Sequence, residues 1–206
     1  MRWFNLPRKK RFDIAGSSLY CDETGGDYYD YIELPCQGSD TYAIVVGDVS
    51  GHGISSALLI AGVRAYLRGR VTQAGSVAEM ISDVNRLVSA DTIKTNQFMT
   101  LFFLVVEAQT GRITWVRAGQ DPALLYSPDE DHFEKLEGQG IPLGVEESWQ
   151  YEDYAQTLRP GQILVLTTDG VLEAHEDALM HKMGRMLGVR HEELMALKLR
   201  VKRSDT

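Results

Sequence analysis

The sequence has few cysteines, no long apolar run and no signal peptide. Its two cysteines, Cys21 and Cys36, have neither metal-ligand nor redox spacing, so we expect buried free thiols in a reducing compartment, with a disulfide between them as the alternative. The longest unbroken apolar run, Leu101–Val106, is as long as a strand and too short to span a membrane. The basic residues 1–11 are not followed by the apolar segment of a signal peptide. The sequence therefore predicts a cytoplasmic protein with no membrane insertion.

Basic residues are in the minority. The chain of 206 residues has 21 Lys and Arg against 29 Asp and Glu, a net charge of −8, which argues against broad nucleic-acid binding. The basic residues are concentrated at the two ends, which leaves residues 12–181 with 9 basic and 26 acidic side chains and a net charge of −17. Acidic side chains that converge in space need protons or divalent cations to coexist. The length fits a single domain, and its acidic part is where we expect a cation site.

Apolar periodicity predicts strands first and two helices after them. Strand-like segments rich in Tyr, Ile and Val cover residues 12–21, 28–34 and 41–49. The last of these is apolar at successive positions, so we expect it to be buried on both faces. Apolar residues, Leu58 among them, then recur at helical spacing from Ile54 to Arg68. Ser76 and Glu79 form the capping box of a second helix, whose apolar stripe includes Leu87.

Strands return in the second half of the chain. Further strand-like segments cover residues 98–107, 112–117, 124–127, 133–136 and 163–166. Arg159–Gln162 has the Pro and Gly of a type II turn, and residues 171–200 are expected to be mostly helical. Strands, two helices, strands and a final helix in this order predict an α+β fold with antiparallel sheets rather than an alternating βαβ fold.

Three acidic clusters lie beside glycines at the ends of predicted strands. They are Gly25–Asp30, Gly47–Gly53 and Thr167–Gly170. Asp48 and Asp169 each follow a strongly apolar strand, where a carboxylate is costly unless it is paired or coordinated. Glycine lets backbone carbonyls approach a ligand, and sites with oxygen ligands alone suit Mg²⁺ or Mn²⁺. The alternative is a set of Asp-Gly turns with solvated carboxylates, but three clusters together favour a metal site.

Five segments of the chain resemble the motifs of the SpoIIE-type phosphatases, the bacterial branch of the metal-dependent PPM serine/threonine phosphatases. In chain order they are Gly25–Asp30, Asp48–Gly53, Ala118–Tyr126, Ile141–Gly144 and Thr168–Ala174. The resemblance runs from about Phe12 to Ala174. A lone Gly-Gly-Asp would be a weak signal, and it alone raises the alternative of a nucleotide cyclase, which the later motifs do not fit. The order and spacing of all five segments make the resemblance specific.

The resemblance implies a central antiparallel β-sandwich flanked by helices, the αββα arrangement of PPM phosphatases. It also implies two Mn²⁺ or Mg²⁺ ions at one edge of the sandwich. Carried over by motif, Asp27 ligates metal, Asp48 bridges both ions, the Val49 carbonyl oxygen completes one shell and Asp169 binds the second ion. Family members use the metal-bound water to attack phosphoserine or phosphothreonine directly, and this assigns catalysis to the same three aspartates.

The resemblance further implies a substrate and a domain context. Family substrates are commonly phosphorylated anti-sigma-factor antagonists of the STAS type, which makes such a phosphatase the resetting arm of a partner-switching pathway. The catalytic domain usually follows a sensory or receiver domain. We therefore interpret residues 1–11 as the remnant of a basic linker and residues 12–206 as a phosphatase domain that is expected to lack its last strand.

The chain departs from the family pattern at two places. Relatives usually carry Asn and His where this chain has Arg117 and Gln120, positions that we expect to be structural or to support the site. Relatives also end with an acidic pair that leads into the last strand and ligates metal, and Asp205 is the candidate for that position. Without such a carboxylate the second metal should bind weakly, so the alternative function is a catalytically weak or inactive module that binds a regulatory partner.

Two smaller questions remain open from the sequence. Asp30 either supports the metal site or is simply exposed. An apolar set near the end of the chain either packs within the chain or forms a homodimer interface. Its members are Met183, Met186, Leu187, Leu194 and Leu197.

Overall fold

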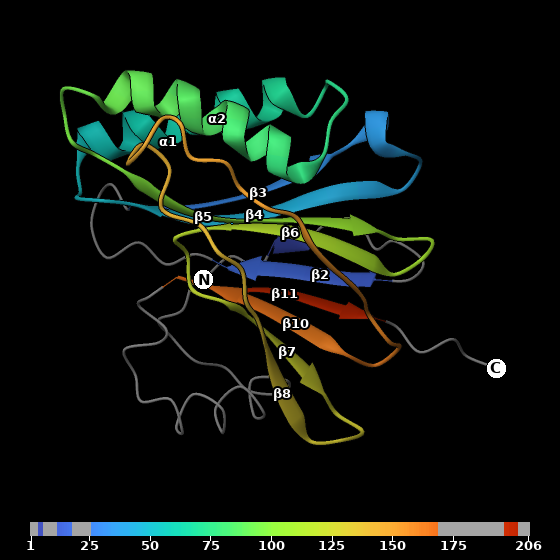
Figure 1. Cartoon of the computed structure of the whole chain (residues 1–206). Helices are drawn as coiled ribbons and strands as arrows, with labels where there is room; N and C mark the ends of the chain where they lie inside the picture. Colours follow the sequence, from blue (N-terminus) through green and yellow to red (C-terminus); the bar gives the residue numbers. More distant parts are fainter. Residues whose placement is uncertain (1–3, 6–11, 18–25, 169–195, 202–206) are drawn as a thin grey trace.

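The computed structural model describes residues 4–5, 12–17, 26–168 and 196–201. Two antiparallel sheets lie face to face, and helices α1 and α2 cover the outer face of one of them (Figure 1). The helix-covered sheet has five strands in the order β3-β4-β5-β6-β9, and the other has six in the order β1-β2-β11-β10-β7-β8. This arrangement confirms the predicted α+β fold with antiparallel sheets.

Most predicted strands are present with nearly the expected bounds. The five-stranded sheet consists of β3 (Asp27–Glu33), β4 (Thr41–Val49), β5 (Met99–Glu107), β6 (Arg112–Ala118) and β9 (Tyr154–Thr157). The six-stranded sheet consists of β1 (Phe4–Asn5), β2 (Phe12–Ser17), β7 (Ala123–Ser127), β8 (His132–Leu136), β10 (Ile163–Thr167) and β11 (Ala196–Val201). A 3₁₀ helix, η1 (Pro35–Gln37), lies between β3 and β4.

Strand β4 separates the two hydrophobic cores. Successive side chains of a strand point to opposite faces of the sheet. Ala43 and Val45 accordingly pack with the apolar side chains of α1 and α2, whereas Tyr42 and Ile44 pack between the two sheets. Both faces of β4 are therefore buried, as predicted, and the strand holds its last residues in a fixed position.

Both predicted helices form, although two of their expected core residues are exposed. Helix α1 spans Ile54–Arg70 and α2 spans Val77–Thr92. Leu58 is 68% exposed and Leu87 is 46% exposed, so the prediction that they face the core was wrong. The buried residues next to them are Leu59 in α1 and Val84 and Val88 in α2.

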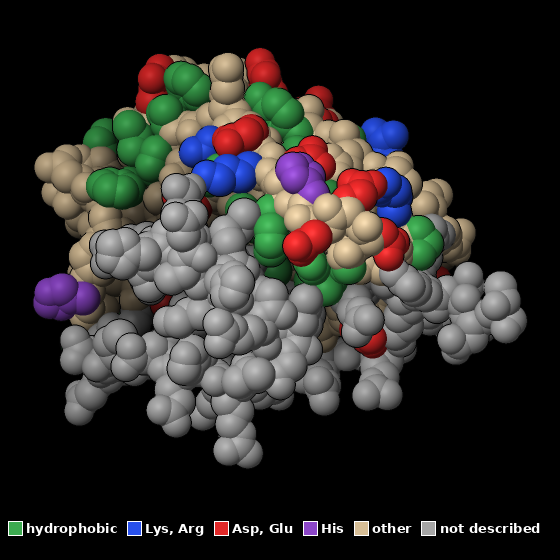
Figure 2. All heavy atoms as spheres, turned by 90° about the horizontal axis from the view of Figure 1, so that it is seen from below, with side chains coloured by type: hydrophobic (Ala, Val, Ile, Leu, Met, Phe, Trp, Pro, Cys, Tyr) green, Lys and Arg blue, Asp and Glu red, His purple; other side chains and the backbone are tan. Residues whose placement is uncertain are grey.

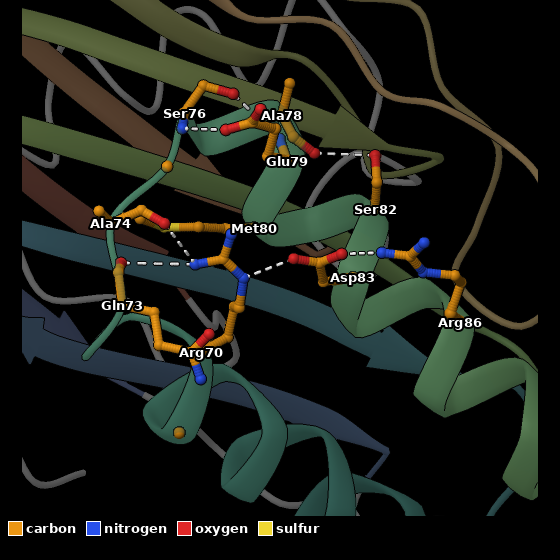
Figure 3. A network of polar contacts seen from close by, with 12 residues as sticks. Arg70, Gln73, Ala74, Ser76, Ala78, Glu79, Met80, Ser82, Asp83 and Arg86 are labelled. Carbon is orange, nitrogen blue, oxygen red and sulfur yellow. Dashed lines mark hydrogen bonds and ion pairs between the residues drawn. The ribbon is translucent and has the colours of Figure 1, made fainter.

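Polar contacts fix the turn between the helices (Figure 3). The predicted capping box is confirmed, because the Ser76 hydroxyl accepts a hydrogen bond from the Glu79 amide at 3.1 Å and the Glu79 carboxylate accepts one from the Ser76 amide at 2.8 Å. Arg70, the last residue of α1, donates its Nε to Asp83 of α2 at 2.6 Å. Its Nη1 donates to the Ala74 carbonyl oxygen at 3.1 Å. The end of α1 and the beginning of α2 are thereby held together.

Strand β11 corrects the prediction that residues 171–200 are mostly helical. It lies between β2 and β10 and pairs antiparallel with both. Residues 196–201 alternate between apolar and basic types after Ala196, a period of two that is typical of a strand. The rest of the predicted helix, and four of the five residues of the candidate dimer interface, lie outside the described residues; Leu197 is in β11.

Two further predictions are corrected. Cys36 is a free thiol, as expected, but it is exposed rather than buried, and its Sγ donates to the Thr72 carbonyl oxygen at 3.1 Å. Cys21 lies outside the described residues.

Strand β9 was not predicted; it pairs with β6 at the edge of the five-stranded sheet. Among the described residues, no helix is long and apolar enough to cross a membrane.

Charged side chains of both signs lie together on the face seen from below. Figure 2 shows acidic and basic side chains interspersed over the described part of this face, with one histidine among them and another apart from them at the left edge. Around the β7–β8 hairpin, Arg159 Nη1 lies 2.8 Å from Glu130 Oε1, and the Tyr126 hydroxyl donates to Asp131 at 2.8 Å. The charges of this hairpin are thus partly paired rather than gathered into a surface of one sign.

Candidate metal centre

The first two acidic clusters meet at the β3–β4 pair. Strand β3 begins at Asp27 and β4 ends at Val49, and the antiparallel register places Asp27 directly opposite Asp48. The Val49 amide donates to the Gly26 carbonyl oxygen at 3.0 Å, which extends the pairing beyond the strand. Directly opposite residues on neighbouring strands have side chains on one face, and like charges there repel each other. The register thus creates a place where a cation between two carboxylates is stabilising.

Oxygen atoms converge at Gly26. A Cβ atom added to Gly26 would lie 2.8 Å from Oδ1 of Asp48 and 3.0 Å from the carbonyl oxygen of Val49. The carbonyl oxygen of Gly51 lies 3.4 Å from the same point. Only glycine fits here without displacing these atoms. The donor set consists of one carboxylate and two carbonyl oxygens, with Asp27 beside it, and it fits Mg²⁺ or Mn²⁺, which prefer oxygen ligands.

The loop after β4 is pinned to the neighbouring strand β5. The Ser50 amide donates to the Phe98 carbonyl oxygen at 2.9 Å, and the Phe98 amide donates to the Ser50 hydroxyl at 3.0 Å. Gly51 and Gly53 have φ values of +89° and +88°, a left-handed region that glycine adopts without strain. These contacts hold the Val49 and Gly51 carbonyl oxygens where they face Gly26.

The third predicted cluster begins at the end of a strand of the other sheet. Strand β10 ends at Thr167, and Thr168 is buried. Asp169, the next residue and a predicted ligand, lies outside the described residues. Within the described part of the chain, no three His, Cys, Asp or Glu side chains gather in a possible metal site. The described residues therefore bring together Asp27, Asp48 and the Val49 carbonyl oxygen of the predicted ligand set.

Asp30 belongs to an ion-pair cluster instead of the ligand set. Arg68 donates its Nε and Nη2 to the Asp30 carboxylate at 2.8 and 2.6 Å, and Arg64 Nε lies 3.4 Å from it. The Tyr28 hydroxyl also donates to it at 3.1 Å. Burial, with a smaller effect of the Asp30 charge, raises the pKa of Tyr28 above its ordinary value, so the phenol remains a donor. Asp30 thus connects β3 to α1.

Two further motif segments, Ala118–Tyr126 and Ile141–Gly144, pack against each other. Gly119 has a φ of +72°, and a Cβ atom added there would lie 2.5 Å from the ring of Pro142. The fully buried Asn85 side chain of α2 accepts from the Gly144 amide at 3.0 Å and donates to the Glu146 carbonyl oxygen at 2.7 Å. Close packing therefore explains Gly119 opposite Pro142, and the buried amide of Asn85 fixes the backbone around Gly144.

Sequence reasoning overlooked a second acidic pair. Thr167 at the end of β10 pairs with Ala196 at the beginning of β11. The beginning of β11 therefore lies beside the end of β10. The acidic residues that precede this strand are Glu192 and Glu193, whereas Asp205 follows it. The signal was the alternation in residues 196–201, which begins two residues after an acidic pair. Both glutamates lie outside the described residues.

Known proteins match most of this chain. The sequence model of the Stage II sporulation protein E (SpoIIE) family matches residues 38–200. Phosphoserine phosphatase RsbU of Bacillus subtilis is 27% identical over 173 residues, which cover 84% of this chain and 50% of RsbU. The chain therefore spans about half the length of this relative.

Solved structures share the fold. The PP2C phosphatase domain of SpoIIE from Bacillus subtilis, solved with a fragment of its regulatory domain, superposes with a TM-score of 0.73 at 16% identity, over 94% of this chain and 62% of that one. RsbX, solved in complex with magnesium, superposes with a TM-score of 0.69 at 14% identity, over 98% of this chain and 100% of that one. With the family model matching well over half of its residues, the chain belongs to the SpoIIE family.

Proposed function

We propose that this chain hydrolyses phosphoserine or phosphothreonine on a protein substrate with the help of two Mn²⁺ or Mg²⁺ ions. The observation that carries the proposal is the convergence of Asp48 Oδ1 and the Val49 and Gly51 carbonyl oxygens at Gly26, opposite Asp27. Bound there, divalent cations would lower the pKa of a water molecule and neutralise phosphate charge. The relationship to RsbU, a phosphoserine phosphatase, supports the same reaction.

Each residue has a distinct part in the proposal. Asp27 and Asp48 would hold the ions from neighbouring strands and supply negative charge, and Asp48 would be the ligand that the two ions share. The Val49 carbonyl oxygen contributes a neutral ligand at a fixed place, because its strand is buried on both faces. Asp169 contributes the carboxylate of the six-stranded sheet. These residues act by holding the ions and orienting the phosphate and the water between them.

We propose Glu192 or Glu193 as the fourth carboxylate in place of Asp205. The support is the register of β10 and β11. The first residue of β11 pairs with the last residue of β10, so an acid shortly before β11 is connected to the same end of the sheet as Asp169, which follows β10. Charge-neutral variants test this assignment: Glu192→Gln and Glu193→Gln together should reduce the number or affinity of Mn²⁺ sites in calorimetry, whereas Asp205→Asn should leave both unchanged. The reverse result would restore Asp205.

Membership of the family supports a proposal for the substrate and the setting. We propose that the substrate is a phosphorylated STAS-type anti-sigma-factor antagonist in the cytoplasm, and that an upstream sensory or receiver domain regulates the phosphatase. In this proposal residues 12–206 form the catalytic domain, and residues 1–11 connect it to the upstream domain and pair with its β2 through β1. Assay against a phosphorylated STAS protein and a phosphoserine peptide of the same local sequence would separate recognition of the folded substrate from recognition of the phosphate.

The decisive experiment compares two aspartates of the same hairpin. Asp48→Asn removes a carboxylate at the site, and Asp40→Asn removes one at the other end of the β3–β4 hairpin, where Asp40 has a φ of +61° that asparagine also tolerates. With Mn²⁺ and p-nitrophenyl phosphate, we expect Asp48→Asn to lose activity by a factor of about 10³ or more, a loss comparable to that of removing a catalytic charge, and Asp40→Asn to retain it. A wild-type chain that binds Mn²⁺ and a phosphoprotein without turnover would support the regulatory module instead.

A further inference from the structure

A buried glutamine connects the two sheets beside the candidate metal centre. Gln120 follows β6 and is 4% exposed. Its Nε2 donates to the carbonyl oxygen of Thr167 in β10 at 3.0 Å, and its Oε1 accepts from the hydroxyl of Thr100 in β5 at 2.5 Å. Thr100 belongs to the five-stranded sheet and Thr167 to the six-stranded sheet. The amide of Gln120 is therefore a direct polar link between the two sheets.

The hydrogen bonds of this link have only one possible direction. The Thr167 carbonyl can only accept, so the amide nitrogen of Gln120 must face it and the amide oxygen must face Thr100. Thr100 has a single hydroxyl hydrogen and two acceptors within reach, Gln120 Oε1 at 2.5 Å and the Asp48 carbonyl oxygen at 3.3 Å, and the shorter contact assigns the hydrogen to Gln120. Its oxygen then accepts from the Asp48 amide, which lies 3.3 Å away. A chain of hydrogen bonds thus runs from the backbone of Asp48 to the backbone of Thr167.

The two ends of this chain carry the proposed metal ligands. Asp48 is the proposed bridging carboxylate, and Thr167 precedes Asp169 by two residues. We propose that Gln120 is a positioning residue, which fixes the two ligand-bearing segments relative to each other so that both ions bind. This inference rests on the proposed metal-dependent function, and it assigns to Gln120 a role in metal affinity rather than in contact with the substrate.

Arg117 supports Gln120 from behind. Its Nε donates to the Gln120 carbonyl oxygen, and its Nη1 donates to the Gly138 carbonyl oxygen at 2.6 Å. The side chain of Gln120 is thus fixed through its amide and its main chain through Arg117. Arg117 and Gln120, for which the family resemblance implies Asn and His, are therefore in direct contact and form one unit.

The chain offers a matched control at the opposite end of β10. Gln162 precedes the strand and is 6% exposed. Its Nε2 donates to the Ser127 hydroxyl at 2.8 Å, and its Oε1 accepts from the Arg159 amide at 2.7 Å. Gln162 thus resembles Gln120 in burial and in hydrogen bonding, but its partners lie away from the candidate metal centre. Replacement of either glutamine by methionine removes both hydrogen bonds with little change in volume.

The test compares Mn²⁺ binding with folding. We expect Gln120→Met to weaken Mn²⁺ binding at one or both sites by about 10–100-fold in calorimetry, the usual effect of removing a group that orients metal ligands. Gln162→Met should lower the melting temperature of the metal-free chain by about as much as Gln120→Met does. It should leave the Mn²⁺ affinity unchanged. Gln120→His, measured at pH 8 where imidazole is neutral and has one donor and one acceptor, should recover most of the affinity.

A second variant protects the test if Gln120→Met fails to fold. Thr100→Val keeps the shape of the side chain and interrupts the hydrogen-bond chain in its middle, so it should also weaken Mn²⁺ binding. Unchanged Mn²⁺ binding in the folded variants, or an equal loss in Gln162→Met, would overturn the positioning role. No Mn²⁺ binding by the wild-type chain would overturn the proposed function itself, and with it this inference.

Discussion

The two sheets of the sandwich differ in how they are assembled from the chain. In the five-stranded sheet, β3, β4, β5 and β6 pair in chain order, with the two helices inserted between β4 and β5. In the six-stranded sheet, β11 pairs with β2 and β10, so strands from distant parts of the sequence become neighbours. The proposed metal ligands come from both sheets, because Asp27 and Asp48 belong to the first and Asp169 follows β10 of the second in the sequence. The candidate site therefore depends on both kinds of assembly.

The largest expected effect tests the contribution of the five-stranded sheet. Gly26→Ala places a Cβ atom 2.8 Å from Asp48 Oδ1, so the oxygens must move apart, and we expect Mn²⁺ affinity and activity to fall by about 100-fold or more. Gly69→Ala in α1 is the control, because its Cβ would meet no atom within 4 Å and alanine favours a helix by about 1 kcal/mol. Calorimetry and urea unfolding measure both effects. Unchanged Mn²⁺ affinity in Gly26→Ala would show that the oxygen atoms around Gly26 do not bind the metal.

A change of intermediate size tests the packing between the sheets. Leu164 of β10 is fully buried between the sheets, and we expect Leu164→Ala to lower the free energy of unfolding by about 2–5 kcal/mol. Val165, the next residue of the same strand, points to the other face and is only half-buried. Val165→Ala should therefore cost less. Equal losses in urea unfolding would show that β10 is not anchored through its inner face.

The smallest expected effect concerns the edge of the six-stranded sheet. The hydrogen bond from Arg159 lowers the pKa of Glu130. A lowered pKa in the folded state stabilises the fold above the ordinary pKa of a glutamate, about 4.3, and this stabilisation is lost as the pH falls through the lowered value. Both side chains are exposed, so the effect on unfolding should be minor. In an NMR titration, Arg159→Gln should return the Glu130 pKa toward its ordinary value, and no change would contradict the pairing.

Local patterns were sufficient to predict strands β3, β4, β5 and β6 of the five-stranded sheet and both helices. Strand β4 was identified by its apolar run and α2 by its capping box, because both signals come from residues that are close together in the sequence. The same reasoning placed Asp27 and Asp48 at strand ends. It could not give the register that sets them opposite each other, because register depends on how two strands pair.

The predictions that failed depended on distant partners. The short strand β9 forms because β6 offers it an edge, and residues 196–201 become a strand between β2 and β10. The exposure of Leu58 and the pairing of Asp30 with Arg68 also depend on which surfaces meet in the fold. The link through Gln120 had no signal in the sequence beyond its departure from the usual residue, because its two partners belong to different sheets.

The central place of β11 has a consequence for synthesis on the ribosome. It is translated after every other described strand, yet β2 and β10 become joined only through it. Until then both have an open edge, and unpaired strand edges favour aggregation. The five-stranded sheet can pair as soon as β9 has emerged, whereas the six-stranded sheet must wait, and such pairing between distant segments is slow. The last described strand of the chain is therefore the one that closes the two open edges of the six-stranded sheet.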